Sequence, residues 1–197
     1  MTNNIQLVGR VRDIRYSHST ANNQYYKIKI IVDSNSTGNP DTFVNLVVNE
    51  KDLKNKPINN NELISIVGYL RSRNDNEAHT TDIYVSSDLR ESTNESNLVE
   101  LSGNVCKIIG YSETEYNNYF HFILANFYEV QSGNKVYKLN SYIPCLVKGE
   151  LAKEYYSKVH VSDKVNLIGR LKSHTYKKDG IINNVYDVVV SDIVLEA

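Results

Sequence analysis

Arginine, lysine and tyrosine residues recur close together in both halves of the 197-residue sequence. The group in the first half comprises Arg10, Arg12, Arg15, Tyr16, Tyr69, Arg71 and Arg73. The group in the second half comprises Lys107, Tyr111, Lys148, Arg170, Lys172, Tyr176, Lys177 and Lys178. Cationic side chains contact phosphates, and an aromatic ring that stacks on a base contributes about 1–3 kcal/mol. This combination is typical of proteins that hold a single strand of nucleic acid without reading its sequence.

A purely structural explanation of the same residues stays open. In β proteins a tyrosine often buries part of its ring and keeps its hydroxyl at the rim of the barrel. Lysine and arginine also mark exposed strand edges, where their charge prevents aggregation. The sequence has 22 Lys and Arg against 23 Asp and Glu, so a nucleic acid site would have to be a local patch.

Residue patterns typical of catalysis and metal binding do not occur in the sequence. It contains no nucleophile beside a base, no paired-carboxylate motif and no glycine-rich phosphate loop. Its 5 histidines are scattered, and Cys106 and Cys145 stand far apart without a Cys-x-x-Cys motif. We therefore expect no enzyme activity, no metal and no cofactor. Both cysteines are expected to be buried or half-buried thiols.

The elements that would position the cations and aromatic rings occur twice along the chain. The matching segments are residues 5–11 and 99–105, 25–30 and 119–124, 43–48 and 142–147, 64–72 and 165–173, and 83–88 and 188–192. Apolar residues alternate with polar ones in these segments, which predicts β-strands. Such self-similarity indicates two copies of one fold.

Each copy therefore has five strands, with a short helical segment between the third and the fourth. This is the element order of the oligonucleotide-binding (OB) fold, a small Greek-key barrel. Glycines within the first and fourth strands suit the sharp coiling of such a barrel. We predict an all-β chain of two tandem OB-fold barrels. The first domain would span residues 1–90, a polar linker residues 91–97, and the second domain residues 98–197.

With these motifs in this order, the sequence resembles the bacterial single-stranded DNA-binding protein family, as two successive units that cover nearly the whole chain. The sequence also resembles a close variant of this family, primosomal replication protein N. In the first unit the matching motifs are residues 7–11, 43–48, 67–73 and 79–85. The resemblance implies that aromatic residues stack on the bases of single-stranded DNA and that basic residues lie near its backbone. It assigns stacking positions to Phe43, Phe127, Tyr128, Tyr142 and Tyr176.

The sequence departs from this family in two respects. It has no Trp, the residue that commonly stacks on DNA in the family, so stacking would fall to its 15 Tyr and 4 Phe. It also reaches Ala197 just after the last predicted strand, without the acidic-tipped tail by which typical members recruit repair and replication enzymes. We therefore expect an accessory, plasmid, phage or primosome-type role in replication, recombination or mobile-element maintenance.

The resemblance also implies an assembly. We expect a homodimer that offers four barrels, with replication or primosome proteins as further candidate partners. The first residues lack the features of a signal peptide, and no apolar run is long enough to span a bilayer, so a cytoplasmic location is expected. The second barrel is expected to supply more base stacking and the first more phosphate contact. Loss of Arg71 and Arg73 should accordingly flatten the salt dependence of binding.

Two other classes of function remain as alternatives. The neutral net charge and the missing tryptophans favour an OB-fold protein-interaction module of a replication or primosome complex, with weak or no nucleic acid binding. OB barrels also bind RNA and oligosaccharides, and a fold does not fix a function.

Overall fold

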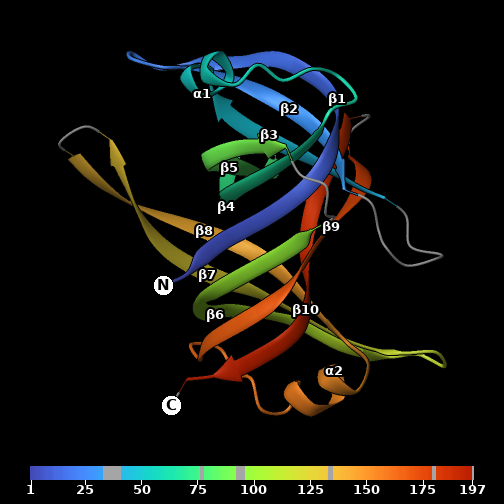
Figure 1. Cartoon of the computed structure of the whole chain (residues 1–197). Coiled ribbons are helices and arrows are strands. Elements are labelled where there is room, and N and C mark those ends of the chain that lie inside the picture. Colours follow the sequence, from blue (N-terminus) through green and yellow to red (C-terminus); the bar gives the residue numbers. More distant parts are fainter. Residues whose placement is uncertain (33–40, 76–77, 92–95, 133–134, 179–180, 197) are drawn as a thin grey trace.

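Ten strands and two short helices make up the computed structural model, which describes residues 1–32, 41–75, 78–91, 96–132, 135–178 and 181–196 (Figure 1). The first half contains β1 (Asn3–Ser19), β2 (Gln24–Val32), β3 (Thr42–Asn49), α1 (Glu50–Asn55), β4 (Leu63–Asp75) and β5 (Ala78–Glu91). The second half contains β6 (Asn97–Glu113), β7 (Asn118–Ser132), β8 (Lys135–Lys148), α2 (Gly149–Tyr155), β9 (Lys164–Lys178) and β10 (Ile181–Leu195). Neither helix in these ranges is long and apolar enough to cross a membrane.

Each set of five strands closes into a barrel. In the first barrel β1 pairs with β2, β2 with β3, β3 with β5, β5 with β4, and β4 with β1. The second barrel repeats this circuit as β6, β7, β8, β10, β9 and back to β6. The prediction of an all-β chain with the OB-fold element order is therefore confirmed. The domain division at residues 91–97 stays a prediction, and residues 92–95 of that segment lie outside the described residues.

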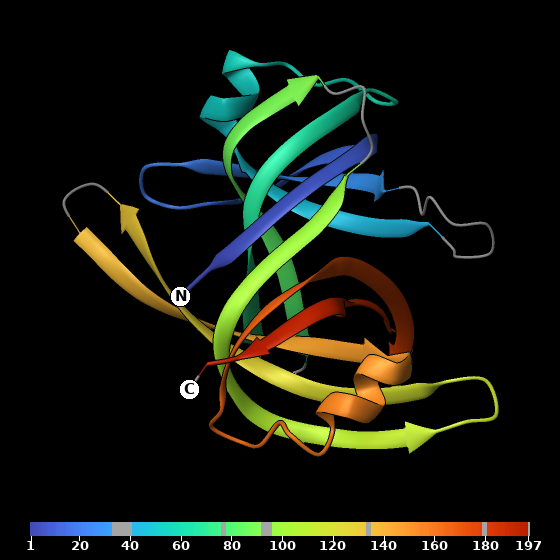
Figure 2. The same cartoon turned by 60° about the horizontal axis from the view of Figure 1, so that its bottom comes forward.

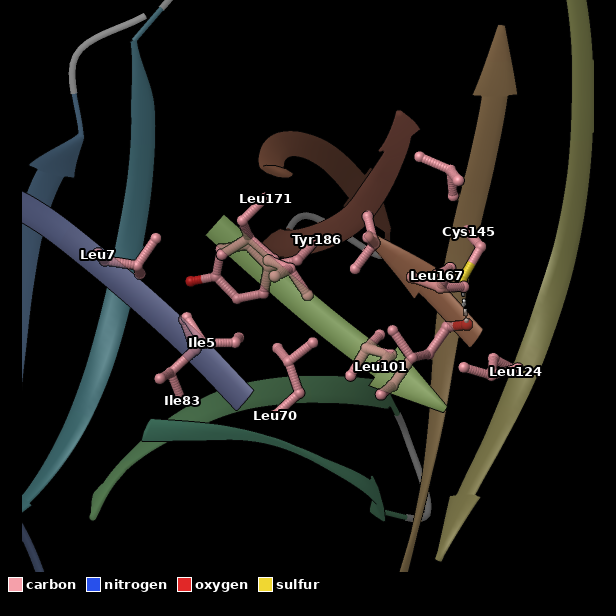
Figure 3. Close-up of a cluster of buried hydrophobic side chains, with 14 of the residues drawn as sticks. Ile5, Leu7, Leu70, Ile83, Leu101, Leu124, Cys145, Leu167, Leu171 and Tyr186 are labelled. Atoms are coloured by element: carbon pink, nitrogen blue, oxygen red, sulfur yellow. Dashed lines mark hydrogen bonds between the residues drawn. The ribbon is translucent and has the colours of Figure 1, made fainter. Parts of the chain in front are cut away.

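Alternate apolar side chains of both barrels form one continuous core. Ile5 and Leu7 of β1 and Leu101 of β6 are at most 2% exposed and belong to the same cluster (Figure 3). Cys145 lies in this core as expected, and burial raises the pKa of its thiol far above the ordinary value. The expectation was wrong for Cys106, which is exposed. A bulge between Val105 and Lys107 interrupts the pairing of β6 with β7 at this residue and leaves the cysteine on the outside.

The two barrels are joined by antiparallel pairing of β1 with β6 (Figure 2). Ile5 is the partner of Val99, and these residues occupy the same position in the two copies of the repeat. On either side Asn3 pairs with Leu101 and Leu7 pairs with Asn97, so the register is reciprocal. A pseudo-two-fold axis therefore passes between Ile5 and Val99 and relates one barrel to the other.

Glycines at equivalent positions of the first and fourth strands let neighbouring strands approach closely. A Cβ atom at Gly103 of β6 would lie 2.4 Å from the carbonyl oxygen of Ala125 on β7. A Cβ atom at Gly68 of β4 would likewise lie 2.4 Å from the carbonyl oxygen of Tyr84 on β5. No side chain fits at these distances, which explains why glycine recurs at both places in the repeat.

Candidate nucleic-acid interface

Phe43 on β3 and Tyr142 on β8 occupy equivalent places on the outer faces of the two barrels. Their side chains are 42% and 39% exposed, far more than the core residues on either side of them in the strands. The backbone N–H of Phe43 donates a hydrogen bond to Ser173 Oγ of the second barrel, 2.9 Å away. The backbone N–H of Tyr142 donates to Ser72 Oγ of the first barrel, at 2.7 Å. The docking of the barrels thus fixes the backbone beneath both exposed rings.

A cation lies beside the Phe43 ring, and a second one lies further along the same row of the sheet. Lys29 of β2 alternates with the buried residues Ile28 and Ile30 and therefore lies on the outer face. Its Nζ lies 4.9 Å from the centroid of the Phe43 ring, within the range of a cation–π contact. Arg10 of β1 is exposed and pairs with Ile31 of β2, which in turn pairs with Phe43. Arg10 is therefore about two strand spacings, roughly 10 Å, from Phe43 along the same row of the sheet.

Phe127 on β7 extends the exposed aromatic surface of the second barrel. It pairs with Asn140 of β8, and Tyr142 pairs with Ala125, so Phe127 and Tyr142 are diagonal neighbours on one face of the hairpin. Phe127 is 46% exposed. In Figure 1 this hairpin of β7 and β8 projects beyond the barrel. The exposed fractions of Phe127 and Tyr142 show that both rings are accessible.

Three cations gather on the outer side of the second barrel. Arg170 and Lys172 are two residues apart on β9 and therefore share a face of the strand. The pKa of Lys148, at the end of β8, is lowered first by burial and then by the positive charges of Lys172 and Arg170. Like charges shift a pKa only at short range, so the three side chains lie close to one another. They form a local positive patch, which a nucleic acid site needs in a chain whose net charge is nearly zero.

An acidic residue borders this cationic patch. Asp187 of β10 pairs with Lys172 of β9 in the sheet. Its carboxylate lies 3.5 Å from His174 Nδ1. Burial raises the pKa of Asp187, whereas the charges of His174, His121, Lys148 and Lys172 oppose that rise.

Tyr69 of β4 and Tyr128 of β7 are half-buried where the two barrels meet. Their ring centroids are 5.1 Å apart, and Tyr69 also stacks on Tyr84 of β5 at 5.7 Å. The guanidinium of Arg71 lies over the Tyr84 ring, 5.1 Å from its centroid. These residues form what we call the tyrosine cluster: Tyr69, Tyr84 and Tyr128. The cluster brings together two predicted binding residues, Tyr69 of the first barrel and Tyr128 of the second. Their rings are less accessible than those of Phe43 and Tyr142.

Burial of Tyr69 has a consequence at alkaline pH. Burial is the largest cause of a raised pKa at Tyr69, and the neighbouring Tyr128 is the next. The pKa of Tyr69 rises to about 12. The unfolded chain releases this proton near the ordinary value of 10.0, so the folded state loses stability as the pH rises from 10.0 towards about 12. We expect Tyr69→Phe to lose less stability than the parent chain in urea unfolding over this range. An equal loss in both proteins would contradict the burial of the Tyr69 hydroxyl.

The remaining predicted site residues of the first barrel lie on β1. Arg12, Arg15 and Tyr16 are exposed, and Tyr16 packs edge-on against Tyr26 at 6.0 Å. The Nη1 atoms of Arg10 and Arg12 donate to the backbone carbonyl and side-chain oxygen of Asn61, at 2.9 and 3.3 Å. The arginines are thus held near the connection between α1 and β4.

Four predicted site residues are described only by their backbone. Arg73 lies on β4, and Tyr176, Lys177 and Lys178 lie on β9, but their side chains fall outside the described part of the chain. Lys29 and Tyr84 were not selected from the sequence. The alternation of β2 could have placed Lys29 on the outer face of the barrel, although not beside Phe43.

Comparison with known proteins identifies the fold. No protein-family model matches the sequence, and a search of curated proteins finds no match. The solved structure of the single-stranded DNA-binding protein from Thermus aquaticus superposes with a TM-score of 0.77 at 15% sequence identity, over 100% of this chain and 93% of that chain. A deletion mutant of that protein gives a TM-score of 0.76 at 15% identity, over 100% and 95% of the two chains. The resemblance to single-stranded DNA-binding proteins is thus confirmed at the level of the fold.

Proposed function

We propose that this chain binds single-stranded DNA across the outer faces of both barrels. Bases would stack on Phe43 and Tyr142, and Lys29 beside Phe43 together with the patch of Lys148, Arg170 and Lys172 on the second barrel would contact the phosphates. The observation that carries the proposal is the placement of two exposed aromatic rings at equivalent positions, each on a backbone fixed by a serine of the other barrel. The fold shared with the Thermus aquaticus single-stranded DNA-binding protein supports the same reading.

The chemistry of this surface favours a single strand over a duplex. An exposed ring can stack on a base only when the face of that base is free, which is not the case inside a double helix. The cations contribute a term that depends on salt but not on sequence, because each phosphate contact releases counterions. Lys29 beside Phe43 and the patch of Lys148, Arg170 and Lys172 supply this term in the two barrels.

Binding of labelled oligo-dT and of a matched duplex at two salt concentrations tests the proposal. We expect the oligo-dT to bind more tightly than the duplex, and we expect its affinity to fall as salt rises. Equal affinity for both, or no binding of either, would refute single-strand binding. In the second case the protein-interaction function becomes the leading explanation. The exposed apolar residues Ile108 and Ile109 on β6 are the observation that favours it.

The salt dependence identifies the cations that contact phosphates. Replacement of both Arg170 and Lys172 by glutamine is expected to flatten the slope of log affinity against log salt by about 1.4, or roughly 0.7 per lost contact. The control replaces Lys54 and Lys158 by glutamine. These lysines pair with Glu50 and Glu154 on the helices, so the control removes the same charge elsewhere. An unchanged slope in the Arg170 and Lys172 variant would remove the patch from the DNA path.

The proposal includes an assembly of two chains with four barrels. Sedimentation of the protein with and without oligo-dT measures this directly. A mass of about one chain, 22.5 kDa, in both conditions would contradict the homodimer.

A further inference from the structure

Asp82 of β5 and Asp187 of β10 occupy equivalent places in the two barrels. Asp82 pairs with Arg71 of β4, and Asp187 pairs with Lys172 of β9. Both carboxylates are largely withdrawn from solvent, with side chains that are 10% and 21% exposed. Since a buried carboxylate needs positive charge beside it, the basic residues around each aspartate decide the charge of this part of the surface.

In the first barrel these basic residues are lysine and arginine. The Nζ atom of Lys27 on β2 lies 3.2 Å from the Asp82 carboxylate. Arg71 is the strand partner of Asp82, and Arg73 pairs through its backbone with Thr80, two residues before Asp82. Lysine and arginine keep their positive charge throughout the neutral range of pH, so the charge around Asp82 is fixed.

In the second barrel histidines stand at two of these three positions. His121 of β7 stands where Lys27 stands in the first barrel. The sheet links each of them, through one residue of the third strand, to the residue that lies two places after the aspartate. His174 stands where Arg73 stands, since its backbone pairs with the residue two places before Asp187. The Nδ1 atom of His174 lies 3.5 Å from the Asp187 carboxylate. We call His121, His174 and Asp187 the histidine cluster.

The histidine cluster is continuous with the cationic patch of the second barrel. Burial raises the pKa of Asp187, and the charges that oppose this rise come from three neighbouring strands: His174, His121, Lys148 and Lys172. Arg170 acts in turn on Lys148, whose Nζ atom also lies 5.7 Å from the centroid of the Tyr119 ring. A change of charge in the cluster therefore changes the potential at the cations that we propose as phosphate contacts.

The sign of that change does not depend on which group takes up a proton. Histidine is the side chain whose charge changes between about pH 5 and 8. A proton added in this range to His121 or His174 adds a positive charge, and a proton added to Asp187 removes a negative one. Each event makes the patch more positive. Proton uptake and the binding of a polyanion must therefore favour each other.

We propose that the histidine cluster makes DNA binding by the second barrel depend on pH, so that this barrel holds the strand more tightly in mildly acidic solution. The surface around Asp82 keeps its charge and leaves the first barrel as a pH-independent anchor. The proposal rests on the proposed single-strand binding and adds its regulation.

Titration with oligo-dT at low salt, at about pH 7.5 and at about pH 5.5, tests this proposal. We expect the affinity of the parent chain to rise about three- to tenfold at the lower pH, the effect of one added charge roughly 10 Å from a phosphate. The double variant His121→Lys with His174→Arg copies the charges of the first barrel. It should bind at the higher pH at least as tightly as the parent chain binds at the lower pH, and it should respond little to pH.

His160→Gln is the matched control. His160 also lies beside a carboxylate, with its Nδ1 atom 3.7 Å from Asp163, but it is on the connection between α2 and β9. This variant should keep the pH response of the parent chain. His174→Gln is a milder second variant, because the His174 side chain is half exposed, and it should lose part of the rise. Circular dichroism verifies the fold of each protein.

Calorimetry measures the proton uptake itself. Oligo-dT is titrated into the protein in two buffers of different ionisation enthalpy at a pH between the two values. We expect net proton uptake on binding by the parent chain and by His160→Gln, and much less by the double variant.

The outcomes separate this proposal from the proposed function. If the parent chain binds oligo-dT without a rise in affinity on acidification, the pH proposal is overturned and the proposed function stands. The same holds if the folded double variant keeps the full rise and the full proton uptake. If the double variant does not fold, an undiminished rise in His174→Gln overturns the pH proposal instead. Failure of the parent chain to bind oligo-dT at either pH would overturn both.

Discussion

Replacing Phe43 and Tyr142 together by alanine is expected to weaken the binding of single-stranded DNA by about 2–6 kcal/mol. Each ring would lose the stacking of one base, which contributes about 1–3 kcal/mol. Even the lower figure corresponds to a rise in Kd of about thirtyfold. A fluorescence-anisotropy titration with oligo-dT measures the loss, and it should be present at every salt concentration because no charge is removed.

The double variant should remain folded. Both rings are exposed, and the serine contacts of these residues involve the backbone N–H, which alanine retains. Tyr116→Ala is the matched control, because Tyr116 is 88% exposed and lies on the connection between β6 and β7. Circular dichroism verifies the fold of all three proteins. Unfolding of the double variant, or normal affinity in its folded state, would show that these rings do not form the binding surface.

The second large effect concerns the fold. Gly103→Ala is expected to reduce the free energy of unfolding by about 2–4 kcal/mol, since its Cβ would collide with a backbone oxygen rather than with a flexible side chain. Relief requires β6 and β7 to separate, which weakens their hydrogen bonds. For a chain of this size the melting temperature should fall by about 4–16 °C.

Gly110→Ala on the same strand provides the control for Gly103→Ala. A Cβ atom at Gly110 meets no atom within 4 Å. Alanine also restricts the unfolded chain more than glycine does, so this variant should be unchanged or slightly more stable. Urea unfolding of both variants measures the difference. Equal stability of the two would mean that the close approach of β6 to β7 does not constrain residue 103.

The strands and the barrel were predictable because they depend on local alternation. Ile5, Leu7 and Val11 lie at alternate positions of β1, with the exposed residues Gln6 and Arg10 at intervening positions, and their counterparts in the second half repeat the spacing, so the inward faces could be assigned before any contact was known. The pairing of β1 with β6 could not be assigned. Every strand edge carries the same N–H and C=O groups, and the sequence does not state which edge meets which.

In the candidate site, too, local sequence patterns predict some of the residues, and only the pairing of strands and the docking of barrels place the others. Phe43 and Tyr142 follow from the third-strand motif, and both rings lie on the outer faces as a binding residue requires. The half-buried positions of Tyr69 and Tyr128 result from the docking of one barrel on the other, which no local pattern indicates. Lys29 was not predicted as a site residue, because its partner Phe43 is on another strand. Only the register of β2 with β3 makes the two residues neighbours.

The reciprocal pairing of β1 with β6 places two equivalent surfaces of one polypeptide against each other. Between separate chains such an interface would weaken on dilution, because its stability depends on protein concentration. Here the covalent tether keeps each surface at a high and fixed effective concentration beside the other. The two barrels therefore stay together however few copies of the chain are present, and a ligand that needs both meets them in a single encounter.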